Sequence, residues 1–312
     1  MKIERTDNID VADDKIVTLT ETGNICRIRY MTSKITTHIQ KIDENHYVEI
    51  ATGEVKEYKH DKTTRAENVE STRKTFERLR DLINANVTNP NRCLFVTLTY
   101  KENMQDVKRL YDDFRKFNMR FDTYCKNKKF PDYEYISIVE PQGRGAWHCH
   151  VIYIFPKKAP FIPNEDIADV WKNGFTSTKR IKGNVDNVGV YLTAYLTDMQ
   201  IEDIPDVSLL NGISADNIKT VEIIDDNGNK TNKSYIKGLR LKMYPKGTNI
   251  YRHSNGIIQP KITQCSKSEA MKIIGSATKT FEKTISLTDE NGYEISKINY
   301  QYFNKIKKRK RK

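Results

Sequence analysis

Cysteine is scarce and scattered in this sequence of 312 residues. The five cysteines, Cys26, Cys93, Cys125, Cys149 and Cys265, are odd in number, and no two of them form a C-x-x-C pair. Disulfide frameworks and structural zinc ribbons both depend on paired, suitably spaced cysteines. The sequence therefore supports neither of these architectures.

Long apolar runs are also missing. No apolar run approaches the length of about 20 residues that crosses a membrane, and the charged start "MKIERTDNID" lacks the apolar core of a signal peptide. We therefore expect a cytoplasmic protein of a bacterial cell, without a membrane partner. No G-x-x-x-x-G-K-[ST] phosphate loop occurs, so no nucleotide cofactor is expected either.

Positive charge, by contrast, is abundant. The formal net charge is +12 at pH 7, and 37% of the residues are hydrophobic, enough for a globular core. A basic balance favours a polyanionic partner, and without a membrane segment nucleic acid is the better expectation. The last eight residues, "KIKKRKRK", carry seven positive charges. They either contact phosphates or serve as a solubilising tail.

Composition along the chain suggests three parts. Short β-like runs with Gly and Asn breaks predict a β-rich N-terminal extension over residues 1–63. Residues 64–304 follow as the main domain, and their C-terminal part, beyond Gln200, returns to β-like pieces with Asn-Gly turns. Residues 305–312 form the basic tail.

Apolar periodicity places helices and strands within the main domain. Helices are predicted over about 64–86, from near Asn103 onward, over the segment "NEDIADVWKNG" (164–174), and over about 186–199. The run "CLFVTLTY" (93–100) predicts a strand. The longest of these helices has an apolar stripe that should cover a sheet.

Two histidines one residue apart open the apolar run "WHCHVIYIF" (147–155). Because side chains alternate across a strand, His148 and His150 should point to one face. The preceding strand "YEYISIVE" ends at Glu140, and direct pairing of Glu140 with His148 across the glycine loop would put all three on that face. Two imidazoles and a carboxylate can hold Mg²⁺ or Mn²⁺ with positions left open. Alternatively, the histidines are ordinary hydrogen-bonded strand residues and Glu140 a surface residue at a strand end.

Two tyrosines four residues apart lie in the segment "NVGVYLTAYLTD" (187–198). On the predicted helix, Tyr191 and Tyr195 project side by side. A phenol near a divalent cation is an effective nucleophile at phosphorus. The alternative is that this pair belongs to an apolar core stripe.

Three motifs in this order resemble those of the HUH endonucleases: "FVTLTY" (95–100), "EPQGRGAWHCHVIYIF" (140–155) and "YLTAYLTD" (191–198). The sequence is similar to rolling-circle replication initiators, in the replication-associated group related to filamentous-phage nicking proteins. The resemblance implies an α+β fold with a central antiparallel sheet of about five strands, the histidine strand in its middle. Amphipathic helices should cover one face, and the opposite face should form the active site.

The resemblance also implies roles for the residues that match its motifs. His148 and His150 would hold the cation with Glu140 as the third ligand, and Tyr191 or Tyr195 would form a 5′-phosphotyrosyl link. The substrate would be single-stranded or origin DNA. A host helicase and a DNA polymerase would be partners, since the chain has no phosphate loop of its own.

Further residues are candidates for DNA contact. Related motifs often carry Lys three residues after each tyrosine, where this chain has Ala194 and Asp198, which leaves open the source of the positive charge. Loop residues beside the histidines could grip a phosphate or stack a base, although the loop tryptophan could equally anchor the packing. The candidates are Arg144, Trp147, Lys179, Lys182, Thr97 and Thr99.

Other readings of the same motifs stay open. A transposase of the HUH superfamily would share the metal strand and the tyrosine helix. A non-catalytic, basic module for binding single-stranded DNA would need the metal site only for its fold. Cupins and amidohydrolases are disfavoured, because His38, His46, His60 and His253 form no second cluster of ligands.

Overall fold

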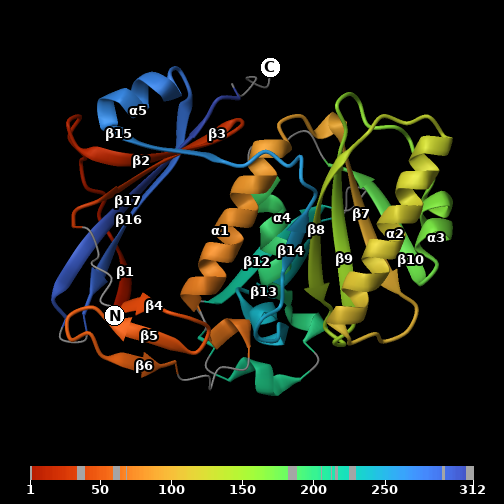
Figure 1. Ribbon diagram of the computed structural model, residues 1–312, viewed down its shortest axis with the longest axis horizontal. Coiled ribbons are helices and arrows are strands. Elements are labelled where there is room, and N and C mark those ends of the chain that lie inside the picture. The colour runs from red at the N-terminus through yellow and green to blue at the C-terminus, as the bar shows by residue number, and fades with distance from the viewer. Residues whose placement is uncertain are drawn as a thin grey trace. The chain divides into compact units, whose positions relative to one another are not determined.

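The computed structural model describes residues 2–33, 39–58, 64–67, 69–181, 188–204, 206–211, 213–214, 217–224, 230–289 and 292–306. The chain divides into two compact units, one of Met1–Asp61 with Pro260–Lys312 and the other of Lys62–Gln259. Both combine antiparallel sheets with helices, which confirms the predicted α+β class (Figure 1).

The unit of Lys62–Gln259 is built on a five-stranded antiparallel sheet, here called the central sheet. The histidine strand lies in its middle, as predicted. In spatial order the strands are β10 (Gly174–Arg180), β7 (Cys93–Tyr100), β9 (Trp147–Ile154), β8 (Glu134–Pro141) and β14 (Tyr251–His253).

Helix α2 (Val107–Asn127) shows how the sequence builds this unit. Its start is fixed by Asp106, whose carboxylate accepts hydrogen bonds from the backbone N–H groups of Lys108 and Arg109 at 2.8 and 3.2 Å. Its apolar stripe is buried, and the Phe121 ring lies 4.5 Å from the ring of Tyr153 on β9. The predicted amphipathic helix therefore does cover one face of the central sheet.

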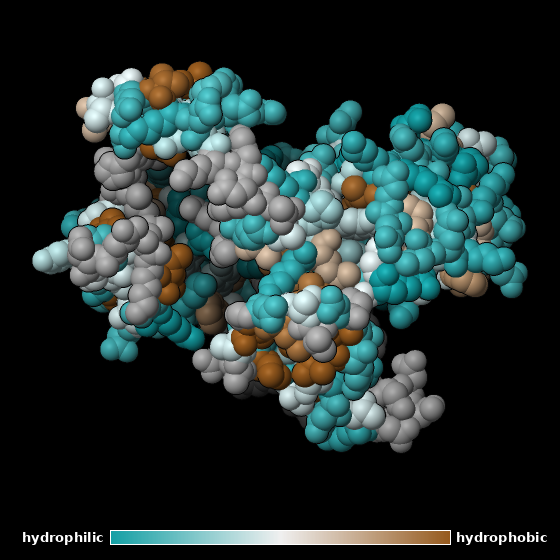
Figure 2. All heavy atoms as spheres, turned by 90° about the horizontal axis from the view of Figure 1, so that it is seen from below, coloured by the Kyte–Doolittle hydropathy of each residue, from teal (hydrophilic) through white to brown (hydrophobic). Residues whose placement is uncertain are grey.

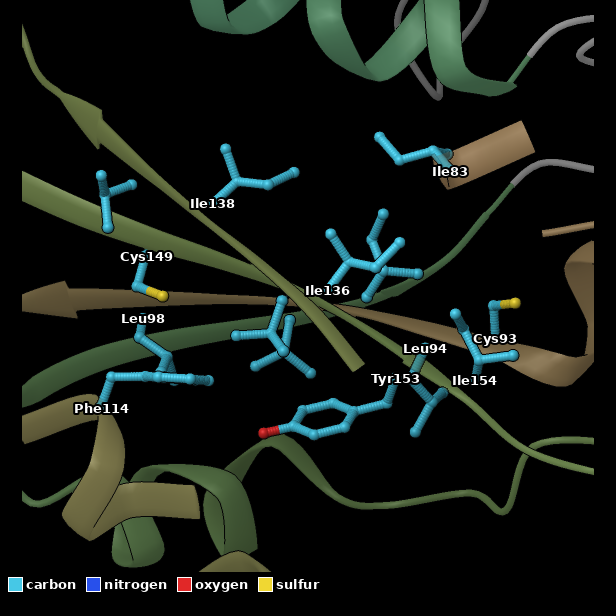
Figure 3. Close-up of a cluster of buried hydrophobic side chains, with 14 of the residues drawn as sticks. Ile83, Cys93, Leu94, Leu98, Phe114, Ile136, Ile138, Cys149, Tyr153 and Ile154 are labelled. Atoms are coloured by element: carbon cyan, nitrogen blue, oxygen red, sulfur yellow. The ribbon is translucent and has the colours of Figure 1, made fainter. Parts of the chain in front are cut away.

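Helices flank both faces of the central sheet, which differs from the expected arrangement. Helices α2 and α3 (Asn164–Trp171) lie on one side, and α1 (Val69–Asn86) and α4 (Val188–Thr197) on the other (Figure 1). In the close-up of Figure 3, Ile83 of α1 lies on the side of Ile136 and Ile138, opposite Phe114 and Tyr153. An apolar helix stripe does not specify which face it covers, and the isoleucines beyond the histidines also require burial.

The rest of this unit is a small sheet and short 3₁₀ segments. The sheet has the order β11 (Met199–Gln200), β13 (Lys230–Ile236), β12 (Ile218–Ile224). The 3₁₀ segments are η1 (Arg65–Glu67), η2 (Pro90–Arg92), η3 (Ile201–Asp203), η4 (Val207–Leu210) and η6 (Leu239–Met243).

The second unit joins the two ends of the chain in one six-stranded sheet. Its order is β1 (Lys2–Thr6), β16 (Thr278–Thr288), β17 (Glu294–Asn304), β3 (Ile25–Met31), β2 (Ile16–Thr22), β15 (Lys261–Ser266), with α5 (Lys267–Ile274) packed against it and a small sheet of β4 (Ile39–Lys41), β5 (His46–Glu49) and β6 (Val55–Glu57) beside it in the chain. The expected division had assigned the segment up to residue 304 to the main domain. The two divisions differ because β17 pairs along its length with β3.

The surface is polar over most of the view in Figure 2, where hydrophobic residues form small separate groups. Within the described residues, no helix is both long and apolar enough to span a membrane. All five cysteines are free thiols, and four of them are buried.

Candidate active site

The register of the hairpin places the candidate ligands together. Strands β8 and β9 pair with Glu140 directly opposite His148, which is the pairing expected from the sequence. Strand β7 continues the row, since Thr99 pairs with His148, and β10 extends it with Phe175. Paired residues of adjacent strands share a face. We call this side of the central sheet the histidine face.

His150 is held by three neighbours on that face. Its Nε2 lies 2.6 Å from Oε2 of Glu140, and its Nδ1 lies 3.1 Å from the hydroxyl of Thr97. The ring stacks on Phe95 with centroids 5.4 Å apart. Both nitrogens therefore have partners, and the ring orientation is fixed.

Glu140 is buried, with 8% of its surface exposed, and both of its oxygens are engaged. Besides His150 at Oε2, Nη1 of Arg240 lies 2.5 Å from Oε1. Burial by itself raises the pKa of Glu140, but the hydrogen bond from His150 and the charge of Arg240 outweigh it and lower the pKa below its usual value. The carboxylate is therefore ionised at neutral pH.

His148 has the opposite environment. Its Nε2 is buried and has no hydrogen-bond partner among the described residues. Burial, followed by the nearby His150, lowers the pKa of His148 to about 4, so the ring is neutral at pH 7. An orphaned buried nitrogen costs free energy unless something satisfies it, and a cation would.

The three donors suit a divalent cation in type but are not arranged as a finished ligand set. The ring centroids of His148 and His150 are 6.1 Å apart, and Glu140 is turned to His150 and Arg240. Over the described ranges, no group of three His, Cys, Asp or Glu side chains is placed to hold a metal ion. The orphaned nitrogen of His148 is the observation that fits a metal best.

Arg240 is the residue that sequence reasoning missed. It lies in η6, a hundred residues after Glu140, and nothing in the local sequence marks it. Besides Glu140, its guanidinium donates to the carbonyl of Pro141 at 2.8 Å and to that of Asp198 at 3.3 and 3.4 Å. It thus links the end of β8 to the end of α4.

The tyrosine pair lies on α4, which runs over Val188–Thr197 as predicted to within two residues at each end. The backbone of Tyr191 and Tyr195 is helical, whereas their side chains lie outside the described part of the structure, as does Lys182 altogether. Asp198, which stands where relatives often have Lys, pairs with Lys219 and accepts from the backbone N–H of Gly238 at 3.1 Å. Its carboxylate thus anchors the end of α4.

The other DNA-contact candidates divide between the surface and the core. Trp147 is 3% exposed, its indole donates to the carbonyl of Gln105 at 2.9 Å, and its ring packs on Tyr244 at 5.8 Å. This burial contradicts a base-stacking role and supports the packing alternative, because alternation turns residue 147 away from the histidine face.

Four candidates remain at or near the histidine face. Thr97 and Thr99 are partly buried on it, and Lys179 is exposed on β10, where it pairs with Phe95. Arg144 is exposed in the loop, and its charge contributes to lowering the pKa of His148. Positive charge therefore lies on two sides of the histidines.

Comparison with known proteins decides the family of this segment. Residues 93–200 match the family model of replication-associated proteins of the ORF2 type. The match begins with β7, ends with β11, and contains the histidine strand, Glu140 and the tyrosine helix. It confirms the resemblance of these motifs to replication-associated proteins and indicates a role in DNA replication. Neither the curated proteins nor the solved structures gave a match.

Proposed function

We propose that this protein nicks and rejoins single-stranded DNA at a replication origin and so initiates rolling-circle replication. The observation that carries the proposal is the row of Glu140 and His148 with His150 beside it, on one face of the central sheet. This row lies inside the matched segment, which continues into the tyrosine helix.

His148, His150 and Glu140 are the residues that would hold Mg²⁺ or Mn²⁺. When bound, the cation would polarise the scissile phosphate and offset the charge that develops there. His148 is prepared for such a role because it is neutral at pH 7 and its buried Nε2 has no partner among the described residues. Glu140 contributes a carboxylate that stays ionised.

The tyrosines supply the nucleophile. The oxygen of Tyr191 or Tyr195 attacks the phosphorus, the bond from phosphorus to the 3′-oxygen breaks, and the proton lost by the phenol balances the one gained by the leaving hydroxyl. The 5′-phosphate remains on tyrosine as a diester, and the free 3′-hydroxyl can prime a DNA polymerase. A second tyrosine allows closure while the first still holds DNA. A host helicase would unwind the duplex.

A covalent-adduct assay tests this proposal. The protein would be incubated with Mn²⁺ and single-stranded DNA from its own genetic element, then analysed on denaturing gels. We expect a DNA-linked band that requires metal, persists in at least one of Tyr191→Phe and Tyr195→Phe, and disappears in the double variant. A band lost in one single variant identifies the initiating tyrosine.

Two outcomes would overturn the proposal. If no adduct forms with any segment of that element, the non-catalytic binding module becomes the better description. If nicking survives in the double tyrosine variant, the phosphotyrosine route is excluded.

A further inference from the structure

An aromatic side chain lies exposed in the row of the candidate ligands. Phe175 is 66% exposed on β10, the edge strand of the central sheet. It pairs with Thr99, which pairs with His148, which pairs with Glu140. The row therefore runs from an open aromatic ring to the carboxylate across four strands.

Position distinguishes this ring from other exposed apolar residues. Single exposed apolar side chains are common and need no function by themselves. Phe175, however, is two strands from His148, which corresponds to about 10 Å at the usual spacing of strands. Neighbouring nucleotides of one DNA strand can bridge that distance. Trp147, the aromatic residue that the sequence suggested for stacking, is buried.

Charge and hydrogen-bonding groups follow the same strand. Ser177 and Lys179 alternate with Phe175 on the histidine face, where they pair with Thr97 and Phe95. Lys179 is exposed. An aromatic platform beside a cation is the combination that binds single-stranded nucleic acid, because bases stack on the ring and phosphates contact the cation.

We propose that Phe175 stacks on a base beside the scissile phosphate, with Lys179 contacting the DNA backbone, and that this edge of the central sheet selects single-stranded over duplex DNA. The inference rests on the proposed function for the direction of the strand toward the histidines. Selection follows because the faces of paired bases are covered by their neighbours in a duplex and only an unpaired base can stack on Phe175.

The test compares the affinities of three variants without metal. Fluorescence anisotropy in EDTA would measure binding to a labelled single-stranded oligonucleotide and to its duplex. We expect Phe175→Ala to weaken single-strand binding about tenfold, in the range of one lost stacking contact, and to leave duplex binding unchanged. Phe175→Tyr should bind like the parent. Phe161→Ala removes a ring that is 77% exposed outside the strands and should also bind like the parent.

A spectroscopic measurement separates stacking from a general loss of structure. Oligonucleotides with 2-aminopurine at successive positions should show one position quenched by the parent and by Phe175→Tyr but not by Phe175→Ala. Equal single-strand affinity of Phe175→Ala and the parent, or equal losses on single strands and duplex, would overturn the inference. Since binding is measured in EDTA, a parent that forms no adduct refutes the nicking proposal and not this one.

Discussion

The two imidazoles of β9 differ in environment although one residue separates them. His150 is held at both nitrogens, by Glu140 and Thr97, whereas Nε2 of His148 is buried without a partner among the described residues. His150 is therefore oriented by the protein alone, and His148 has the nitrogen that a ligand would satisfy. This asymmetry is the strongest residue-level support for a metal at this place.

Removal of either imidazole should separate chemistry from binding. We expect His148→Ala and His150→Ala to reduce adduct formation below detection, because the cation loses a ligand. Affinity for single-stranded DNA should stay within about threefold of the parent, since contacts from Lys and Arg to phosphates dominate it. Adduct gels and anisotropy on the same preparations measure both. Parallel losses of cleavage and affinity would contradict the assignment.

The low pKa of His148 predicts a pH dependence of stability. The unfolded chain binds a proton at this ring below about pH 6.5, while the folded protein does so only near pH 4. The stability that this ring contributes is therefore complete above about pH 6.5 and is lost as the pH falls toward 4. In EDTA, His148→Gln should lose less melting temperature between pH 7 and pH 5 than the parent does. Equal losses would show that His148 is not the group responsible.

Sequence reasoning reached most of the residues of the site but not all of them. Alternation put His148 and His150 on one face, and the length of the loop between the strands brought Glu140 opposite His148. Arg240 and Phe175 were missed because neither belongs to a motif. Their contacts depend on how η6 and β10 pack, which local periodicity does not encode.

At the scale of elements, a glycine sets how closely the tyrosine helix approaches α1. The backbone N–H of Gly189 donates to Oδ1 of Asn84 at 2.9 Å. A Cβ at this position would lie 2.5 Å from the carbonyl oxygen of Arg80 and 2.9 Å from that Oδ1. The two helices touch at a point where no side chain fits.

Gly189→Ala should therefore displace the start of α4. Because the nearest atom belongs to the backbone of α1, relief requires movement of a helix, and a cost of about 1–3 kcal/mol is expected from overpacking. Chemical denaturation measures that cost, and the adduct assay should show a slower reaction since the tyrosines move with the helix. Unchanged stability and rate would mean that the helices are not in this close contact.

Arg240 joins two elements of the site, the end of β8 and the end of α4. Arg240→Lys keeps the charge but cannot make the contacts to Glu140, Pro141 and Asp198 together. We expect the rate of adduct formation at saturating Mn²⁺ to fall about tenfold or more, with unchanged DNA affinity. The control is Arg252→Lys, whose guanidinium lies 3.7 Å from the ring centroid of Tyr111 and pairs with Ser137 on the other face. Equal rates in the two variants would contradict a positioning role for Arg240.

Elements with strong apolar patterns were predicted closely, and those without them were not. The strand of Cys93–Tyr100 was found with both bounds, and α2 was found because its stripe is long. Strand β10 was not predicted, since "GFTSTKR" is an edge strand with few apolar residues and owes its conformation to pairing with β7. The helix over Asn164–Trp171 was predicted with Asn164 as its cap, but that side chain instead accepts from Thr176 at 3.1 Å.

For the whole molecule, the pairing of chain ends could not be read from the sequence. Strand β3 pairs with β17, so residues about 270 positions apart meet, Arg29 with Tyr300 for example. Alternation identifies such strands but does not name their partners, because any strand with a matching face can pair. The β-rich lead-in and the C-terminal strands were therefore recognised separately and not as one sheet.

The distribution of charge leads to a prediction for the full chain. Residues 307–312 are all positive, and without them the formal net charge would fall from +12 to +6. The preceding Lys305 is held in the sheet by a 2.9 Å hydrogen bond from its backbone N–H to the carbonyl of Asn24, so a deletion beginning at residue 307 leaves that contact intact.

Deletion of residues 307–312 should flatten the salt dependence of DNA binding without changing the chemistry. For single strands, the logarithm of the binding constant falls with the logarithm of salt concentration by about 0.7 for each phosphate contacted, so a tail that contacts several phosphates contributes a large part of the slope. Anisotropy between low and moderate salt measures the slope, and adduct yield at saturating DNA should match the parent because Glu140, His148 and His150 are untouched. A variant whose six residues are replaced by alternating Gly and Ser controls for length. If all three proteins share one slope, the tail only solubilises the chain, and the contacts to phosphate must come from the histidine face and its neighbours, beginning with Arg144 and Lys179.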